Sequence, residues 1–571
     1  MADFIKTQNS FANGAVASQF YACDNIHGLS RLENMDVLAG GGLSRRRGLR
    51  SVATLKGPAR LIPFSFSDTE EYLIVVTDFC VDIYLGDTYC QSLIAPWSYK
   101  DVSHLQYAQR FGTMIFVHPD YQPQILYKSG NTFYFKEFDF LRNDSDMTAN
   151  MPFVKFDDAS DIKITVSTHS SGNNYAKFTT SKDFWTSENV GGRLYLLGRQ
   201  WLITQYISPT QVVAHTNGTY TLPENPVSDW SESAFSIRRG WPCSITFHQD
   251  RLVFGGSRSW PGGIWMSCVG QHKNFNIGTG LDDEAIFISL LSAQRQQICT
   301  VVSSDNLQIL TNVGEWAISS NPLTPSQVNI KQHTSVGSYT ACYLAPQKIE
   351  GSTIFVSGSG HDIRELALDE LSQNYNANDL CALSKHLMTG PVDIAYNDSL
   401  RQLFVVQSNG TMSVLNQNAS LGISAWGAYK TRGEFLSVAV CGGCTYVAVR
   451  RDKVVYLERF DADTMDDAGK YSFTFVASGM PLRASGHNAS SLRLRKIIAR
   501  VIDTKSISIN NRRIVLPNEI YTAGKSGFSG DVSINLLGTS HECVSPTWTI
   551  HGSDNHPITV LSVSMYGWYK V

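Results

Sequence analysis

The sequence predicts an all-β fold, namely an irregular β-propeller with an inserted small β domain and a C-terminal β domain. Three observations support this prediction. Seven stretches hold two or three short apolar strands joined by small polar turns, segments of helical periodicity are scarce, and only 17% of the 571 residues are charged. Antiparallel units of this size cannot bury their own faces and are typical of propeller blades. The seven stretches are 60–87, 102–127, 244–268, 297–320, 339–368, 392–416 and 434–460.

Residues 1–55 are expected to form an extended N-terminal docking arm, because they show no clear alternation of strands. Three consecutive glycines at 40–42 allow positive φ and close backbone approach. A dense arginine cluster follows, at Arg45, Arg46, Arg47 and Arg50. Guanidinium groups bind both carboxylates and phosphates. The cluster therefore has three interpretations, which are docking on a subunit or portal protein, contact with DNA, and a solvated surface.

The rest of the chain divides into four predicted parts. Residues 56–155 and 236–462 hold the propeller, and 156–235 form an inserted platform-like β domain, because the strand register changes there and loops tolerate insertions. An acidic linker, Asp461–Lys470, leads into the C-terminal β domain at 463–571. Within the propeller, Glu365–Leu387 is the best helix candidate, with an Asn- and Ser-rich middle.

The C-terminal domain contains a second basic segment. Apolar and basic residues alternate from Leu492 to Val501, which predicts a half-exposed strand with one cationic face. That face would carry Arg493, Arg495, Lys496 and Arg500. Docking and DNA contact are again the alternatives to a solvated surface.

Cysteine usage and the N-terminal sequence predict folding in the cytosol. The eleven cysteines are odd in number and lack framework spacing, which favours reduced thiols. The segment MADFIKTQNSFANG has no signal-peptide pattern, and no apolar run is long enough for a membrane helix. Cys441 and Cys444 form a lone CxxC, which indicates a hairpin turn on Gly442 and Gly443 rather than a metal or redox site.

Motifs that resemble catalytic or phosphate-binding sites are weak. Gly524–Ser526 ends like a phosphate-binding loop, but Glu519 stands where its first glycine belongs. Ser357, His361 and Asp362 are neighbours only in sequence, which a catalytic triad does not require, so a glycine-rich turn is favoured. No enzyme activity and no cofactor are therefore expected.

Two further polar turns have functional interpretations. Asp282–Glu284 could bind a hard cation, although calcium needs six to eight oxygens, so a solvated turn or an intersubunit salt bridge is favoured. His248 and Asp250 could form a catalytic pair. Their place in a hairpin turn favours a structural role, with Arg251 pairing a nearby acid.

A series of landmarks along the chain resembles one known family. The landmarks are Asn34–Gly48, Pro63–Phe66 before Glu71–Tyr72, Ala108–Gln109 before Phe116–Pro119, Gly240–Pro242 before Phe247–Gly256, Gly314–Trp316, Thr334–Gly337, Asp379–Leu380 before Ser384–Leu387, and Ala425–Trp426. Their order resembles that in the tail nozzle proteins of short-tailed phages, also called tail tubular protein B or tail stabilisation proteins, over nearly the whole chain. Prophage-derived particles and gene transfer agents carry similar proteins.

The resemblance implies a structural virion protein. It implies a homo-oligomeric ring, a hexamer, that lies below the portal and adaptor proteins and encloses the channel through which DNA leaves. Further implied partners are tail fibres or spikes, double-stranded DNA in transit and the host envelope at ejection. The implied location is the virion tail, which is assembled in the host cytoplasm. A net charge of −3 fits transient passage of DNA rather than tight binding.

Two alternatives come from other functional classes. One is a receptor-binding or adhesin propeller at a particle tip, which would show exposed aromatic grooves. The other is a propeller carbohydrate-active enzyme, which would show paired carboxylates in a pocket.

Overall fold

The computed structural model confirms the all-β fold class. It describes residues 2–21, 26–67, 69–143, 148–290, 294–369, 371–482, 491–516, 527–536, 547–553 and 556–570. Strands make up 54% and helices 4%. The chain forms two compact units, Met1–Ser92 with Leu344–Val571, and Leu93–Tyr343. No helix among the described residues is long and apolar enough to cross a membrane.

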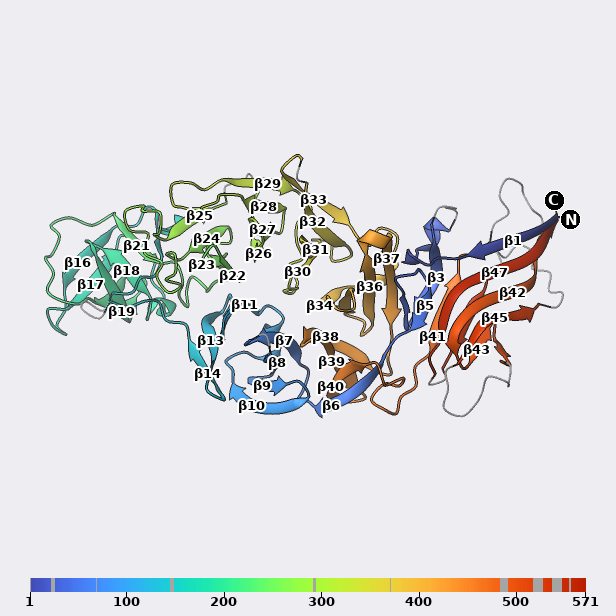
Figure 1. The fold of residues 1–571 in the computed structure, drawn as a ribbon. Helices are drawn as coiled ribbons and strands as arrows, with labels where there is room; N and C mark the ends of the chain where they lie inside the picture. Colours follow the sequence, from blue (N-terminus) through green and yellow to red (C-terminus); the bar gives the residue numbers. More distant parts are fainter. Residues whose placement is uncertain are drawn as a thin grey trace. The chain divides into compact units, whose positions relative to one another are not determined.

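All seven predicted stretches form the first strands of a four-stranded antiparallel meander, the blade unit of a propeller (Figure 1). The second unit contains three blades. They are β11 (Gln106–Arg110), β12 (Thr113–His118), β13 (Tyr121–Ser129) and β14 (Thr132–Glu137); β22 (Ser244–His248), β23 (Arg251–Gly255), β24 (Gly263–Met266) and β25 (Ile286–Ser289); and β26 (Ile298–Ser303), β27 (Leu307–Thr311), β28 (Glu315–Ile318) and β29 (Ile330–Thr334).

The first unit contains the other four blades. They are β7 (Arg60–Ser65), β8 (Glu71–Thr77), β9 (Cys80–Leu85) and β10 (Thr88–Ile94); β30 (Gln347–Ile349), β31 (Ser352–Val356), β32 (Ile363–Asp369) and β33 (Asn374–Asp379); β34 (Pro391–Asn397), β35 (Gln402–Gln407), β36 (Met412–Asn418) and β37 (Ile423–Tyr429); and β38 (Glu434–Cys441), β39 (Cys444–Arg451), β40 (Val454–Asp461) and β6 (Gly48–Thr54). The last blade thus takes its fourth strand from the N-terminal segment.

The prediction of an extended arm at residues 1–55 is wrong. Besides β6, this segment supplies β1 (Ala2–Gln8), β2 (Gly14–Ala15), β3 (Gly28–Glu33), β4 (Met35–Val37) and β5 (Leu43–Arg45) to sheets of the first unit. Several of their partners lie hundreds of residues away, as where Ala2 faces Tyr569. Local alternation could not show such pairing.

The helix predicted over Glu365–Leu387 is also wrong. The described residues of this range form most of β32, then β33, and end in a single 3₁₀ turn at Lys385–Leu387. The Asn-rich middle lies in β33, the outer strand of its blade, where polar side chains remain partly exposed.

The inserted domain is a seven-stranded sheet in the order β15-β21-β18-β19-β20-β17-β16. Its buried core includes Phe178, Trp185, Trp201 and Trp230. The strands are β15 (Phe153–Val154), β16 (Ile164–Thr168), β17 (Tyr175–Thr180), β18 (Arg193–Leu196), β19 (Arg199–Ser208), β20 (Gln211–His215) and β21 (Trp230–Ser233).

The C-terminal domain is built jointly with the N-terminal segment. One sheet has the order β4-β5-β47-β42-β45, with β1 also paired to β47, so the two ends of the chain lie side by side (Figure 1). The other sheet continues from β37 through β2 and β3. The C-terminal strands are β41 (Phe475–Gly479), β42 (Ser491–Thr504), β43 (Ile507–Ile509), β44 (Arg512–Ile514), β45 (Phe528–Asn535), β46 (Thr549–Gly552) and β47 (Thr559–Lys570).

Candidate functional site

Two arginines of the cluster predicted to dock on a partner, Arg45 and Arg46, are buried and bonded within the chain. Arg46, just before β6, is fully buried, and all five of its guanidinium N–H donors are bonded. Nη1 and Nη2 donate to the two carboxylate oxygens of Asp467 at 3.0 and 2.8 Å. Nε donates to Asn34 Oδ1 at 2.9 Å. The other two bonds go to the backbone carbonyls of Arg47 and Lys430.

Asp467 comes from the acidic linker, and its side chain is only 1% exposed. It also accepts a hydrogen bond from Thr431 Oγ1 at 2.6 Å. The guanidinium carbon of Arg46 lies 3.6 Å from the ring centroid of Phe473. We call the Arg46–Asp467 pair the linker clamp. It ties the N-terminal segment to the linker through a buried ion pair whose donors are satisfied.

Arg45 is also buried, and its contacts lie within the chain. Nη2 donates to the Met465 carbonyl at 2.8 Å, and Nη1 donates to the His556 carbonyl at 3.2 Å. The prediction that Arg45 and Arg46 reach a subunit, a portal protein or DNA is therefore wrong. Arg47 and Arg50 are exposed, and Arg50 lies 3.9 Å from Asp461, so docking by these two stays a prediction.

A second, partly buried carboxylate interacts with Arg46 of the clamp. Asp36 on β4 accepts hydrogen bonds from the Tyr429 hydroxyl and from Gln402 Nε2, the latter at 2.9 Å. Burial raises the pKa of Asp36 to about 6, against the opposing effects of the Tyr429 bond and the Arg46 charge. In the folded chain this carboxyl therefore titrates near pH 6, well above an ordinary aspartate.

The cationic strand face predicted in the C-terminal domain is present on β42. Leu494, Ile497 and Ala499 are buried, whereas Arg495 and Arg500 are exposed and Arg493 and Lys496 are half-exposed. Two polar residues, Arg495 and Lys496, follow each other here because the strand has a β-bulge at Arg495. Leu494 pairs with Gly567 and Lys496 pairs with the adjacent Tyr566, so Arg495 is the extra residue.

Two of these four cations have neighbours on the same sheet. Arg500 makes a bidentate pair with Asp531, at 2.8 and 3.1 Å, and this bond raises the Arg500 pKa. Arg493 lies 5.0 Å from the Trp568 ring centroid. Whether this face docks on a partner or contacts DNA stays a prediction.

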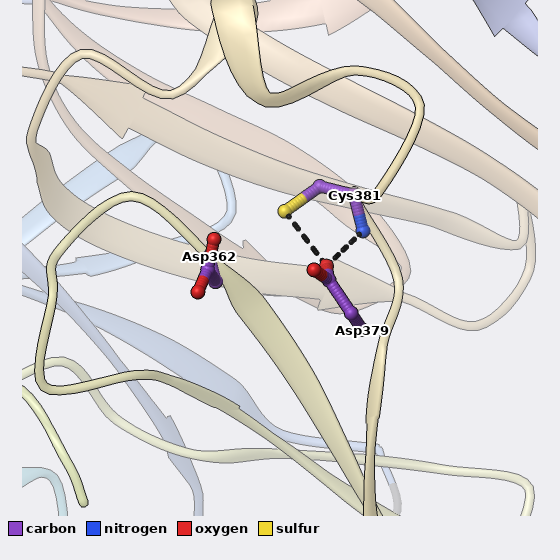
Figure 2. A group of neighbouring side chains, drawn as sticks. All are labelled: Asp362, Asp379 and Cys381. Atoms are coloured by element: carbon purple, nitrogen blue, oxygen red, sulfur yellow. Dashed lines mark hydrogen bonds between the residues drawn. The ribbon is translucent and has the colours of Figure 1, made fainter. Parts of the chain in front are cut away.

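Figure 2 shows a group of possible metal ligands, Asp362, Asp379 and Cys381. Lys385 Nζ lies 2.9 Å from the Asp362 carboxylate and 3.1 Å from that of Asp379, and Arg364 bridges the same two acids. Burial raises the pKa of the Cys381 thiol to about 12, so it does not offer a thiolate. Two cations already balance the two carboxylates, which makes the group a salt-bridge network rather than a metal site.

The neighbouring Ser–His–Asp stretch does not form a triad. His361 Nδ1 donates to the Met388 carbonyl at 3.2 Å, not to a carboxylate. Ser357 Oγ lies 3.5 Å from Asp362 Oδ2, at the limit of a hydrogen bond. These contacts favour a glycine-rich turn over a catalytic triad for this stretch. The phosphate-loop remnant at 519–526 lies outside the described residues.

The turn at 282–284 is organised from within the chain. Glu284 Oε2 accepts the backbone N–H groups of Thr279, Gly280 and Leu281, and the Leu281 bond is the main cause of its lowered pKa. Arg251 donates to the carbonyls of Asp282 and Glu284. The expectation that Arg251 pairs with an acid is thus wrong, because its guanidinium binds backbone carbonyls. These carbonyl oxygens are then not free to coordinate a cation.

Two other local predictions concern hairpin turns. Gly442 and Gly443 have φ of 58° and 71° between Cys441 and Cys444, which confirms the two-residue turn and its need for glycine. His248 Nδ1 lies 2.9 Å from Ser303 Oγ, a contact that helps to hold the ring in place.

Cavities in the second unit bear on the carbohydrate-enzyme alternative. A cavity of about 450 Å³ has two carboxylates in its wall, Glu137 and Asp139. Both are exposed, and Asp139 lies 3.5 Å from Arg142. The general acid of a glycosidase stands in a desolvated setting, which these two exposed carboxylates lack.

Comparisons with known proteins add little. No protein-family model matches the chain, and no curated protein matches it. Among the solved structures that resemble it are three with low TM-scores. BamB from Moraxella catarrhalis is 10% identical with a TM-score of 0.33, covering 72% of this chain and 96% of BamB. The RRP9 WD40 repeats are 6% identical with a TM-score of 0.35, covering 73% of this chain and 100% of theirs. U3-55K is 6% identical with a TM-score of 0.34, covering 72% of this chain and 98% of its own. The fold assignment rests on the sheets themselves.

Sequence reasoning missed Asp467 and Arg193. Asp467 stood out in the sequence only as part of an acidic linker, and no local pattern pairs it with an arginine 421 residues away. Arg193, at the start of β18, stands in no motif. Arg193 is of interest because it lines two cavities, which only the folded chain forms.

Proposed function

We propose that this chain is a structural tail subunit of the nozzle type, which forms a homo-oligomeric ring around a DNA-exit channel. The coarse part of this proposal, the β-propeller fold, is what the sheets show. The virion role, the ring, the adaptor and portal partners, the location in the tail and the absence of enzymatic activity are proposed.

The observation that carries the proposal is that landmarks distant in sequence contact one another. In the second unit, the Trp241 N–H donates to the Pro119 carbonyl at 2.8 Å. Also there, Glu315 accepts hydrogen bonds from Thr334 Oγ1 and from the Val336 N–H.

The first unit shows the same behaviour. Trp426 Nε1 donates to the Leu380 carbonyl at 2.9 Å, and Asn34 binds Arg46 within a single landmark. Landmark residues that bond to one another have a shared structural role. A chance match of short motifs would not predict such contacts. This supports a common architecture for the landmarks.

The surface is compatible with subunit contacts. Charged residues make up 17% of the chain, below the roughly 25% typical of globular proteins. Large apolar side chains are exposed in both units, among them Leu371 at 99%, Ile94 at 87% and Phe111 at 79%. A closed ring needs two complementary faces on each subunit, and such side chains are suited to them.

Mass photometry and negative-stain microscopy of the purified chain test the proposal. We expect particles of six copies of the 63.2 kDa chain, with a central opening. The variants Leu371→Gln and Phe111→Gln should shift the distribution toward the monomer, whereas Lys163→Gln should leave it unchanged. A monomer at every concentration, without rings, would contradict the ring. Turnover of a polysaccharide, abolished by replacing one carboxylate, would contradict the non-enzymatic role.

A further inference from the structure

Two cavities of the second unit meet at one arginine. The first, of about 790 Å³, lies between the inserted sheet and the 275–278 loop, and the second is the cavity of about 450 Å³ described above. Both have Arg193, Met151 and Leu202 in their walls. We call the two cavities together the Arg193 cleft. Each volume is in the range of small-molecule sites, roughly 300–1,000 Å³.

Arg193 makes no ion pair with any residue that the structure describes. Its side chain is half-buried, and no described residue forms a hydrogen bond or an ion pair with its guanidinium. Burial lowers its pKa, and the nearby charge of Arg142 lowers it further. A guanidinium stays protonated at any physiological pH. The fold therefore keeps a partly desolvated positive charge beside a cavity, which an entering anion would stabilise.

An aromatic platform lies beside this charge. Tyr195 is two residues along β18, so its side chain is on the same face as that of Arg193. It is 44% exposed and packs against Phe153 at 5.8 Å between ring centroids. The negative face of an aromatic ring attracts electropositive C–H groups, such as those of a sugar ring.

Polar side chains complete the wall of the first cavity. Asn150, Asn276 and His215 line it and offer donors and acceptors suited to hydroxyl groups. In the second cavity, the exposed carboxylates of Glu137 and Asp139 would repel a chain with a charge on every unit. A polymer in which charged units are separated by neutral ones fits this distribution better than a nucleic acid does.

We propose that the Arg193 cleft binds an acidic polysaccharide through one carboxylate-bearing sugar residue. The guanidinium of Arg193 binds the carboxylate, Tyr195 stacks on the sugar ring, and the amide and imidazole groups bind its hydroxyls. This site lies outside the proposed ring function, and binding needs only the full-length chain.

Titration calorimetry with a hyaluronan hexasaccharide tests the site, because this probe alternates glucuronate with a neutral amino sugar. We expect saturable binding that weakens about tenfold to a hundredfold with the methyl-esterified hexasaccharide, which has lost the charge. Arg193→Gln should cause a similar loss, and Arg193→Lys a smaller one, because Lys keeps the charge but not the fork. Tyr195→Ala should also weaken binding, and Lys163→Gln, an exposed residue of the same domain, should not.

Thermal melting of each variant separates a binding defect from misfolding. The proposal is overturned if the intact chain does not bind the hexasaccharide at millimolar concentration, or if folded Arg193→Gln binds as well as the original. Equal binding of the esterified probe also overturns it. Tighter binding of a six-nucleotide oligothymidylate would show that the cleft is a nucleic-acid site instead.

Discussion

Removing the acid of the linker clamp should destabilise the first unit more than any exposed charge change. In Asp467→Asn the Arg46 guanidinium stays buried but loses its counter-charge, and the new amide N–H₂ faces a guanidinium donor. Breaking a buried ion pair by removing one partner costs about 3 to 5 kcal/mol. The upper part of this range is expected, because both side chains are almost fully buried and the pair is bidentate.

Hydrogen-exchange mass spectrometry is the suitable measurement, because it reports on each segment separately and does not require a chain of two compact units to unfold in one step. Peptides covering 34–54 and 461–475 should lose protection by about a hundredfold or more, as 3 kcal/mol implies. Peptides of the inserted sheet should not change. Arg50→Gln is the matched control, because Arg50 is 58% exposed and its contact with Asp461 is long, so a cost of about 1 kcal/mol or less is expected.

A double variant makes the test stricter. Arg46→Met with Asp467→Leu removes both charges and should cost less than the sum of the single changes. Unchanged exchange in Asp467→Asn, or an equal loss in Arg50→Gln, would refute the argument that the clamp holds the N-terminal segment.

Three more outcomes can be measured. Asp36 loses its proton at lower pH in the unfolded chain than in the folded chain. The free energy of unfolding should therefore fall by about 3 kcal/mol as pH rises from about 4 to about 6, and then level off. Urea titrations at a series of pH values measure this slope, and Asp36→Asn should remove it. Asp379→Asn should not alter calcium or zinc binding by calorimetry, because Lys385 and Arg364 already balance the acids; metal binding lost in this variant would contradict that reading. Replacing residues 156–235 with a short Gly/Ser linker should leave a protease-resistant remainder, and global unfolding would show that the segment belongs to the propeller core.

The blades were predictable because their inner strands are buried on both faces. Every residue of β35 is buried, as is nearly all of β8, so each appears in the sequence as an apolar run. Outer strands carry no such signal, and β10 alternates weakly between exposed and partly exposed positions. Strands β1 to β6 were missed for other reasons. β1 and β6 pair with strands hundreds of residues away, which leaves no local pattern. β2, β4 and β5 are only two or three residues long, too short for a visible alternation.

The basic clusters show what sequence can and cannot supply for a site. The alternation at 492–501 was sufficient to predict the cationic face, and only the bulge at Arg495 was hidden. For Arg46 the residue type correctly indicated a carboxylate partner, but nothing local showed that this partner belongs to the same chain. The carbonyl partners of Arg45 were not predicted. Arg193 needed the cavity itself, because a single arginine beside one tyrosine is common in any strand.

The linker clamp also changes how assembly should respond to salt. Docking through an exposed arginine cluster predicts that salt weakens the ring, because exposed charges are screened over about 8 Å at physiological ionic strength. With Arg45 and Arg46 buried, only Arg47 and Arg50 remain at this place for such contacts. The exposed side chains of Leu371, Ile94 and Phe111 point instead to apolar contacts, which salts such as sulfate strengthen. A ring that persists or grows with added sulfate would thus favour apolar faces over the arginine cluster as the basis of assembly.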